Sequence, residues 1–151
     1  MTPPRVLIIE DGYEYLTAYE RFLGEAFSFV RAGDGPEALD VLAAEPFAAA
    51  VLDMRFDRAE RLLGDLAPLA ARYGDPARAR RFLEDNQGTF ILAALREAGH
   101  GLPVLVSYDF GGEPRRFRNL QARYAPVGWL DDAAGPADIR AALDGAVAGQ
   151  L

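Results

Sequence analysis

Residues 6–11 have the sequence VLIIED, in which four consecutive apolar residues are followed directly by two acids. A short, continuous apolar run of this kind is typical of a strand that is buried on both faces, as in a parallel sheet covered by helices. A second apolar run, residues 48–52, stops at Asp53. The two segments therefore predict buried strands with carboxylates at their carboxyl ends.

Strand-like and helix-like segments alternate along the rest of the chain. We expect five strands, at residues 6–9, 27–30, 48–52, 103–106 and 127–130, and helices at residues 13–26, from Pro36 onward, and at 89–98, 114–124 and 136–148. Alternation of this kind indicates βαβ units, a parallel sheet and helices on both of its faces. The fold class is therefore α/β, doubly wound, and ligands of such sheets gather at the carboxyl ends of the strands.

One stretch is too long for this pattern. Asp53 and Ser107 are 54 positions apart, about twice what a loop, a helix, a second loop and a strand require. We interpret the excess, residues 55–86, as a helical insertion after the third strand, with helices at 57–73 and 76–85. Apolar residues of the first helix, including Leu62, Leu66 and Leu69, are expected to pack on the domain.

Composition limits the functions to consider. A chain of 151 residues fits one domain, which we take as residues 1–151. Its net charge of −7 argues against nucleic-acid binding, and no apolar run is long enough to cross a membrane. The N-terminus has no apolar signal segment, so a cytoplasmic location is expected. There is no cysteine, and all 16 basic residues are arginine.

Acidic residues follow two of the predicted strands. Neighbouring parallel strands lie about 5 Å apart, so Glu10, Asp11 and Asp53 should converge at one edge of the sheet. Carboxylates this close repel one another unless a divalent cation such as Mg²⁺ neutralises them. Ser107, at the end of the fourth strand, adds a hydroxyl to the same edge. The alternative for Asp11 is that it only caps the following helix.

Five segments together resemble a bacterial response-regulator receiver domain in order and spacing. They are VLIIED at 6–11, FVRAGDGPEALDVL at 29–42, AAVLDM at 49–54, PVLVS at 103–107 and GWLDD at 128–132. The resemblance covers nearly all of the chain outside the insertion. It implies a flavodoxin-like sheet with strand order 2-1-3-4-5.

The resemblance also implies roles for individual residues. Asp53 would be the phosphoacceptor and Ser107 the switch hydroxyl. A Mg²⁺ ion would be held by Glu10, Asp11, Asp53 and the backbone carbonyl of Arg55. The partner would be a protein, with a histidine kinase as the phosphodonor.

The sequence departs from the family at the fifth strand. Where the family has a lysine followed by proline, this chain has Asp132 and Ala133. An anion there opposes the binding of a phosphoryl group. The arginines nearest in sequence that could substitute are Arg55, Arg115 and Arg116. Tyr108 stands where the family has a small residue, and Trp129, near the family's aromatic switch position, is expected in the core.

Three functions remain open from the sequence. The first is a receiver-like signalling domain that acts by binding a protein partner and is phosphorylated on Asp53. The second is a pseudo-receiver, a docking module that has lost the phosphorylation chemistry. The third is a flavodoxin-like enzyme that binds a nucleotide or flavin, which lacks support because no glycine-rich phosphate loop follows the first strand. In neither of the first two would the chain turn over a separate substrate.

Overall fold

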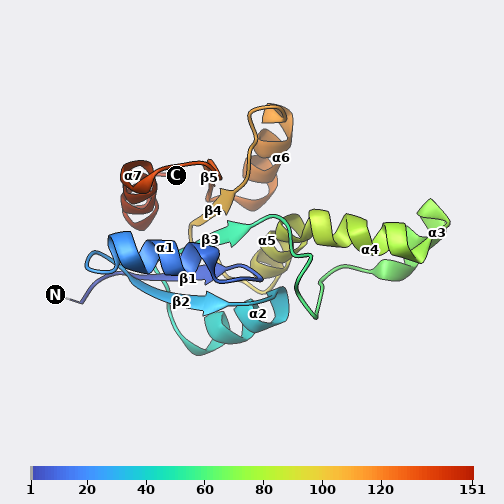
Figure 1. The fold of residues 1–151 in the computed structure, drawn as a ribbon, viewed down its shortest axis with the longest axis horizontal. Helices are drawn as coiled ribbons and strands as arrows, with labels where there is room; N and C mark the ends of the chain where they lie inside the picture. Colours follow the sequence, from blue (N-terminus) through green and yellow to red (C-terminus); the bar gives the residue numbers. More distant parts are fainter. Residues whose placement is uncertain (1) are drawn as a thin grey trace.

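A parallel five-stranded sheet forms the centre of the computed structural model, which describes residues 2–151 (Figure 1). Its strands are β1 (Arg5–Ile9), β2 (Ser28–Ala32), β3 (Ala49–Asp53), β4 (Val104–Ser107) and β5 (Val127–Leu130). They lie side by side in the order β2-β1-β3-β4-β5, and every neighbouring pair is parallel. The doubly wound α/β fold and the strand order 2-1-3-4-5 are therefore confirmed.

Seven helices accompany the sheet in the described part of the chain. They are α1 (Glu14–Leu23), α2 (Gly35–Ala44), α3 (Leu66–Tyr73), α4 (Pro76–Asp85), α5 (Gln87–Glu97), α6 (Pro114–Tyr124) and α7 (Pro136–Val147). The buried side chains of α1 and α7 share one core cluster, and those of α2, α5 and α6 share the other. The sheet therefore separates two hydrophobic layers, as the continuous apolar runs in β1, β3 and β4 predict.

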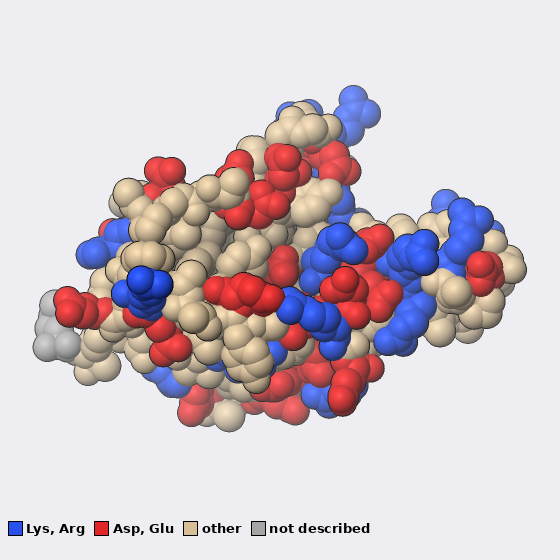
Figure 2. Space-filling view, in the orientation of Figure 1, with Lys and Arg blue, Asp and Glu red and all other residues tan. Residues whose placement is uncertain are grey.

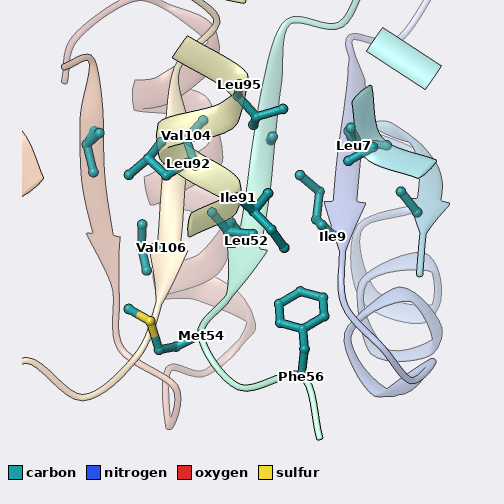
Figure 3. Packing of buried hydrophobic residues seen from close by; sticks show 14 of the residues in the cluster. Leu7, Ile9, Leu52, Met54, Phe56, Ile91, Leu92, Leu95, Val104 and Val106 are labelled. Atoms are coloured by element: carbon teal, nitrogen blue, oxygen red, sulfur yellow. The ribbon is translucent and has the colours of Figure 1, made fainter. Parts of the chain in front are cut away.

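Successive side chains of β1 point alternately into the two hydrophobic layers. Val6 and Ile8 belong to the cluster under α1 and α7, whereas Leu7 and Ile9 belong to the opposite one. Figure 3 shows this second cluster, in which side chains from β1, β3 and β4 meet α5 and the buried ring of Phe56. Both layers reach the carboxyl edge of the sheet and fix the strand ends there.

The first helix of the insertion is shorter than the sequence analysis predicts. It begins at Leu66, not at residue 57, and Asp65 caps it by accepting a hydrogen bond from the backbone N–H of Ala67 at 3.2 Å. Gly64, with a φ of +105°, turns the chain immediately before the cap, in a conformation that residues with a side chain rarely adopt. Residues 57–65 are instead an irregular segment.

Tertiary contacts hold this irregular segment against the domain. Phe56 is fully buried, and its backbone N–H donates to the carbonyl of Glu84 at 2.9 Å. Arg61 donates two hydrogen bonds of 3.0 Å to the carboxylate of Asp34. The buried amide of Gln87 accepts from the N–H of Leu63 and donates to its carbonyl. The bonds of Phe56 and Leu63 satisfy backbone groups without a helix, and the Arg61 pair anchors the segment by its side chain.

Helices α3 and α4 form an arm, residues 66–85, that extends away from the sheet (Figure 1). Leu62 packs on the domain core as expected, but Leu66 is exposed and no residue of α3 is buried, so the expected packing of α3 on the domain is wrong. The arm is joined to α5 by aromatic contacts, with ring centroids of Tyr73 and Phe82 5.8 Å apart and those of Phe82 and Phe90 6.4 Å apart.

Trp129 is also placed differently from the expectation. It is 39% exposed, although it points to the same face of the sheet as the buried Val127, because β5 is an edge strand of the sheet. The indole packs on Phe110 and Phe117, and its N–H donates to the carbonyl of Tyr108. Trp129 therefore covers the rim of the core at this edge of the sheet and is not buried in it. None of the helices in the described range has the length and apolar character needed to cross a bilayer.

Candidate functional site

A polar pocket of about 290 Å³ opens at the carboxyl edge of the sheet. It is lined by Asp11, Tyr15, Asp53, Met54, Arg55, Asp57, Arg58, Ser107, Tyr108 and Asp132. Asp53 and Ser107 are direct neighbours in the register of β3 and β4. The structure thus brings together three of the four side chains predicted to gather here, and the fourth, Glu10, lies outside the lining.

Asp53 projects into this pocket from the end of β3. Its Oδ1 accepts a hydrogen bond from the backbone N–H of Met54 at 2.8 Å. The pKa of its carboxyl group is raised to about 6, chiefly by burial and in addition by the negative charges of Asp11 and Glu10, while hydrogen bonds from the backbone of Met54 and Arg55 oppose the increase. Asp53 is therefore a partly protonated group near neutral pH.

Glu10 caps the N-terminus of α1. The side chain is buried, and its two oxygens accept hydrogen bonds from the backbone N–H groups of Tyr15 at 3.1 Å and Leu16 at 2.8 Å. Tyr13, the residue before α1, makes no side-chain cap, so Glu10 satisfies N–H groups that the helix start leaves unpaired. Burial raises the pKa of Glu10 in spite of these bonds.

Asp11 faces an arginine that the sequence analysis did not select. Its Oδ2 accepts from the backbone N–H of Arg58 at 2.7 Å, and its Oδ1 accepts from the Arg58 guanidinium at 3.2 Å. The same guanidinium donates to both carboxylate oxygens of Glu14, at 2.7 and 3.2 Å. This pairing lowers the pKa of Glu14 to about 2. Arg58 lies within residues 57–73, for which the leucine spacing predicts a helix. A helix there would not indicate a contact between Arg58 and Asp11.

Ser107, the predicted switch hydroxyl, is buried and already paired. Its Oγ donates to the hydroxyl oxygen of Tyr15 at 3.1 Å. Tyr15 stands on α1 and lines the same pocket, and burial raises its pKa. The Ser107 hydroxyl is thus directed toward α1.

The side of the pocket next to β5 is acidic. Asp132 lines it, and the pKa of Asp132 is raised by burial and by the neighbouring charges of Asp131 and Asp109. Within residues 2–151, no arginine forms an ion pair with Asp132. Among the residues that the structure describes, Asp132 is therefore an acid without an ion-pair partner at the position to which the resemblance assigns a lysine.

Two of the three arginines nearest in sequence, Arg55 and Arg116, have other partners. Arg55 lines the pocket, but its guanidinium pairs with Asp85 at 3.2 Å and with Asp57 at 3.9 Å. Arg116 donates to the side-chain oxygen of Asn86 at 2.6 Å and lies over the ring of Tyr108, 5.0 Å from its centroid. Neither Arg116 nor Arg115 lines the pocket.

The acids do not form a ligand set for a divalent cation in this arrangement. Over the described range, no three His, Asp or Glu side chains are grouped so that they could hold a metal ion. The physical reason is visible in the contacts of Glu10 and Asp11, whose oxygens already accept hydrogen bonds from α1 and Arg58. The expected Mg²⁺ site thus does not fit the side chains as they lie.

Solved structures with the same architecture are numerous, although no protein-family model and no curated protein matches the sequence. The chemotaxis protein CheY4 of Vibrio cholerae is 16% identical, with a TM-score of 0.65 over 96% of this chain and 99% of that one. The receiver domain of Francisella response regulator 1452 is 14% identical, with a TM-score of 0.67 over 98% and 99%. A CheY-like receiver domain protein of Methanospirillum hungatei is 17% identical, with a TM-score of 0.66 over 99% and 97%. The chain therefore has the fold of response-regulator receiver domains, with a helical arm added after β3.

Proposed function

We propose that this chain is a receiver-like signalling module that acts by binding a protein partner, without phosphoryl transfer to Asp53. The observation that carries the proposal is the charge of the pocket on its β5 side. A phosphoryl group on Asp53 would bring close to two negative charges into a space that Asp132 already lines. In the described part of the chain no arginine pairs with Asp132, so a phosphoryl group would meet uncompensated negative charge on this side of the pocket.

A second candidate is a receiver that is phosphorylated on Asp53. It is favoured by the register that sets Asp53 beside Ser107 and by their shared position in an open pocket. In this case the Ser107 hydroxyl would exchange its Tyr15 partner for a phosphoryl oxygen. The two candidates differ in whether Asp53 accepts a phosphoryl group at all.

Intact-mass measurement after incubation with magnesium and acetyl phosphate separates the two candidates. We expect no phosphoryl adduct on the wild-type chain, while a phosphorylatable receiver domain treated in parallel gains one. An Asp53→Asn variant serves as the matched control. If the wild-type chain gains an adduct that the Asp53→Asn variant does not, the proposal is wrong and the phosphorylated receiver replaces it.

A further inference from the structure

The carboxylate of Asp11 is enclosed by a single arginine. Its side chain is only 2% exposed, and Arg58 supplies a donor to each of its oxygens, the backbone N–H to Oδ2 and the guanidinium to Oδ1. Hydrogen bonds between charged groups are stronger than neutral ones. Asp11 therefore already has a cationic partner within the chain.

Arg58 neutralises a second carboxylate at the same time. Its guanidinium forms a fork with both oxygens of Glu14 in the first turn of α1, while it also contacts Asp11 after β1. A planar guanidinium can bridge two carboxylates in this way, because its donors point in fixed directions. One side chain thus joins the carboxyl end of β1 to the start of α1.

The chain on either side holds Arg58 in this position. Phe56 and Ala59 are buried, and Arg61 is bound to Asp34 by two hydrogen bonds. These contacts fix the backbone before and after Arg58. Little additional conformational entropy is therefore lost when its guanidinium binds Asp11 and Glu14. The contact between Arg58 and Asp11 therefore follows from the backbone conformation of residues 56–61.

We infer that Arg58 takes the place of a divalent cation in this pocket, so that the chain neutralises Asp11, together with Glu14, with its own guanidinium. A Mg²⁺ ion takes oxygen ligands in near-octahedral positions, and the positive charge of Arg58 beside Asp11 opposes a second cation there. Asp11 offers its oxygens to Arg58, and Glu10 offers its oxygens to α1. A metal ion would have to displace Arg58 before it could bind Asp11.

Titration with Mn²⁺, followed by the electron paramagnetic resonance of the free ion, tests this inference. We expect weak binding to the wild-type chain and binding tighter by about tenfold or more for Arg58→Ala and Arg58→Gln, because the loss of the guanidinium frees the Asp11 carboxylate. The gain should disappear in an Arg58→Ala/Asp11→Asn variant. Circular dichroism checks that each variant is folded, and the second substitution at Arg58 provides an independent folded sample.

Arg55→Ala is the matched control, since Arg55 lines the same pocket but pairs with Asp57 and Asp85. It should bind Mn²⁺ like the wild-type chain. The inference is overturned if wild type binds Mn²⁺ as tightly as the Arg58 variants, or if Arg55→Ala gains as much as they do. No phosphodonor is present, so this result is independent of whether Asp53 can be phosphorylated.

Discussion

An Asp53→Asn variant is expected to be more stable than the wild-type chain at neutral pH by up to about 3 kcal/mol, and no more stable at about pH 3. The pKa of Asp53 is raised from 3.8 to about 6 in the folded state, chiefly by burial. A raised pKa means that the folded chain binds the proton more tightly than the unfolded chain. The resulting stability is fully present below pH 3.8 and is lost as the pH rises through about 6.

Asparagine removes this pH dependence because it cannot ionise, and its Oδ1 can still accept the hydrogen bond from Met54. Urea unfolding of both proteins at a series of pH values measures the difference. Asp57→Asn is a suitable control, since Asp57 lines the same pocket with a 57% exposed side chain. We expect it to change stability by less than about 0.5 kcal/mol at every pH. An Asp53→Asn effect that is constant from acid to neutral pH would contradict the buried-charge explanation.

A Gly88→Ala variant is expected to lose about 2 kcal/mol or more of folding stability, although alanine is the better helix former. A Cβ atom at Gly88 would lie 2.5 Å from the carbonyl oxygen of Asp53 and 2.9 Å from the Cα of Met54. Both are backbone atoms, and the N–H of Gly88 is bound to the carbonyl of Met54 at 2.9 Å. The end of β3 would therefore have to move, and Asp53 with it.

Gly145→Ala is the matched control for this variant. Gly145 also lies in a helix, but a Cβ atom there meets nothing within 4 Å. The Gly145→Ala variant should gain up to about 1 kcal/mol of folding stability from helix propensity alone. Thermal unfolding compares the two variants, and a carboxyl-carbon NMR titration reports whether the pKa of Asp53 shifts in Gly88→Ala. Equal stabilities of the two variants would show that α5 does not pack against β3 as described.

The strands were predictable from the sequence because each one is a local signal. Residues 6–9 and 48–52 are apolar on both faces, and only a strand covered from both sides needs this pattern. The acids at their ends followed from the geometry of parallel strands, which placed Asp11 and Asp53 in one pocket. The strand order came from the resemblance to receiver domains and was not contained in any single segment.

The path of residues 57–65 was not predictable in the same way. Leucines at helical spacing suggested a helix that began at residue 57, whereas contacts with distant residues such as Asp34 and Gln87 decide the actual conformation. One local signal did contradict the long helix. Pro68 cannot donate a backbone hydrogen bond, so it is tolerated in the first turn of α3 but not in the middle of a helix. The ion pair between Arg58 and Asp11 forms only because residues 57–65 follow this irregular path, so it could not be predicted from the sequence either.

The arm and the acidic pocket both contact the same helix, α5. Figure 2 shows arginine side chains prominent on the arm, which carries Arg72, Arg78, Arg80 and Arg81. The rings of Tyr73, Phe82 and Phe90 meet in tilted and edge-to-face contacts that lead from the arm to α5, whose first turn abuts the carbonyl of Asp53. Because Gly88 packs directly against the carbonyl of Asp53, a shift of α5 at this point would also move the end of β3.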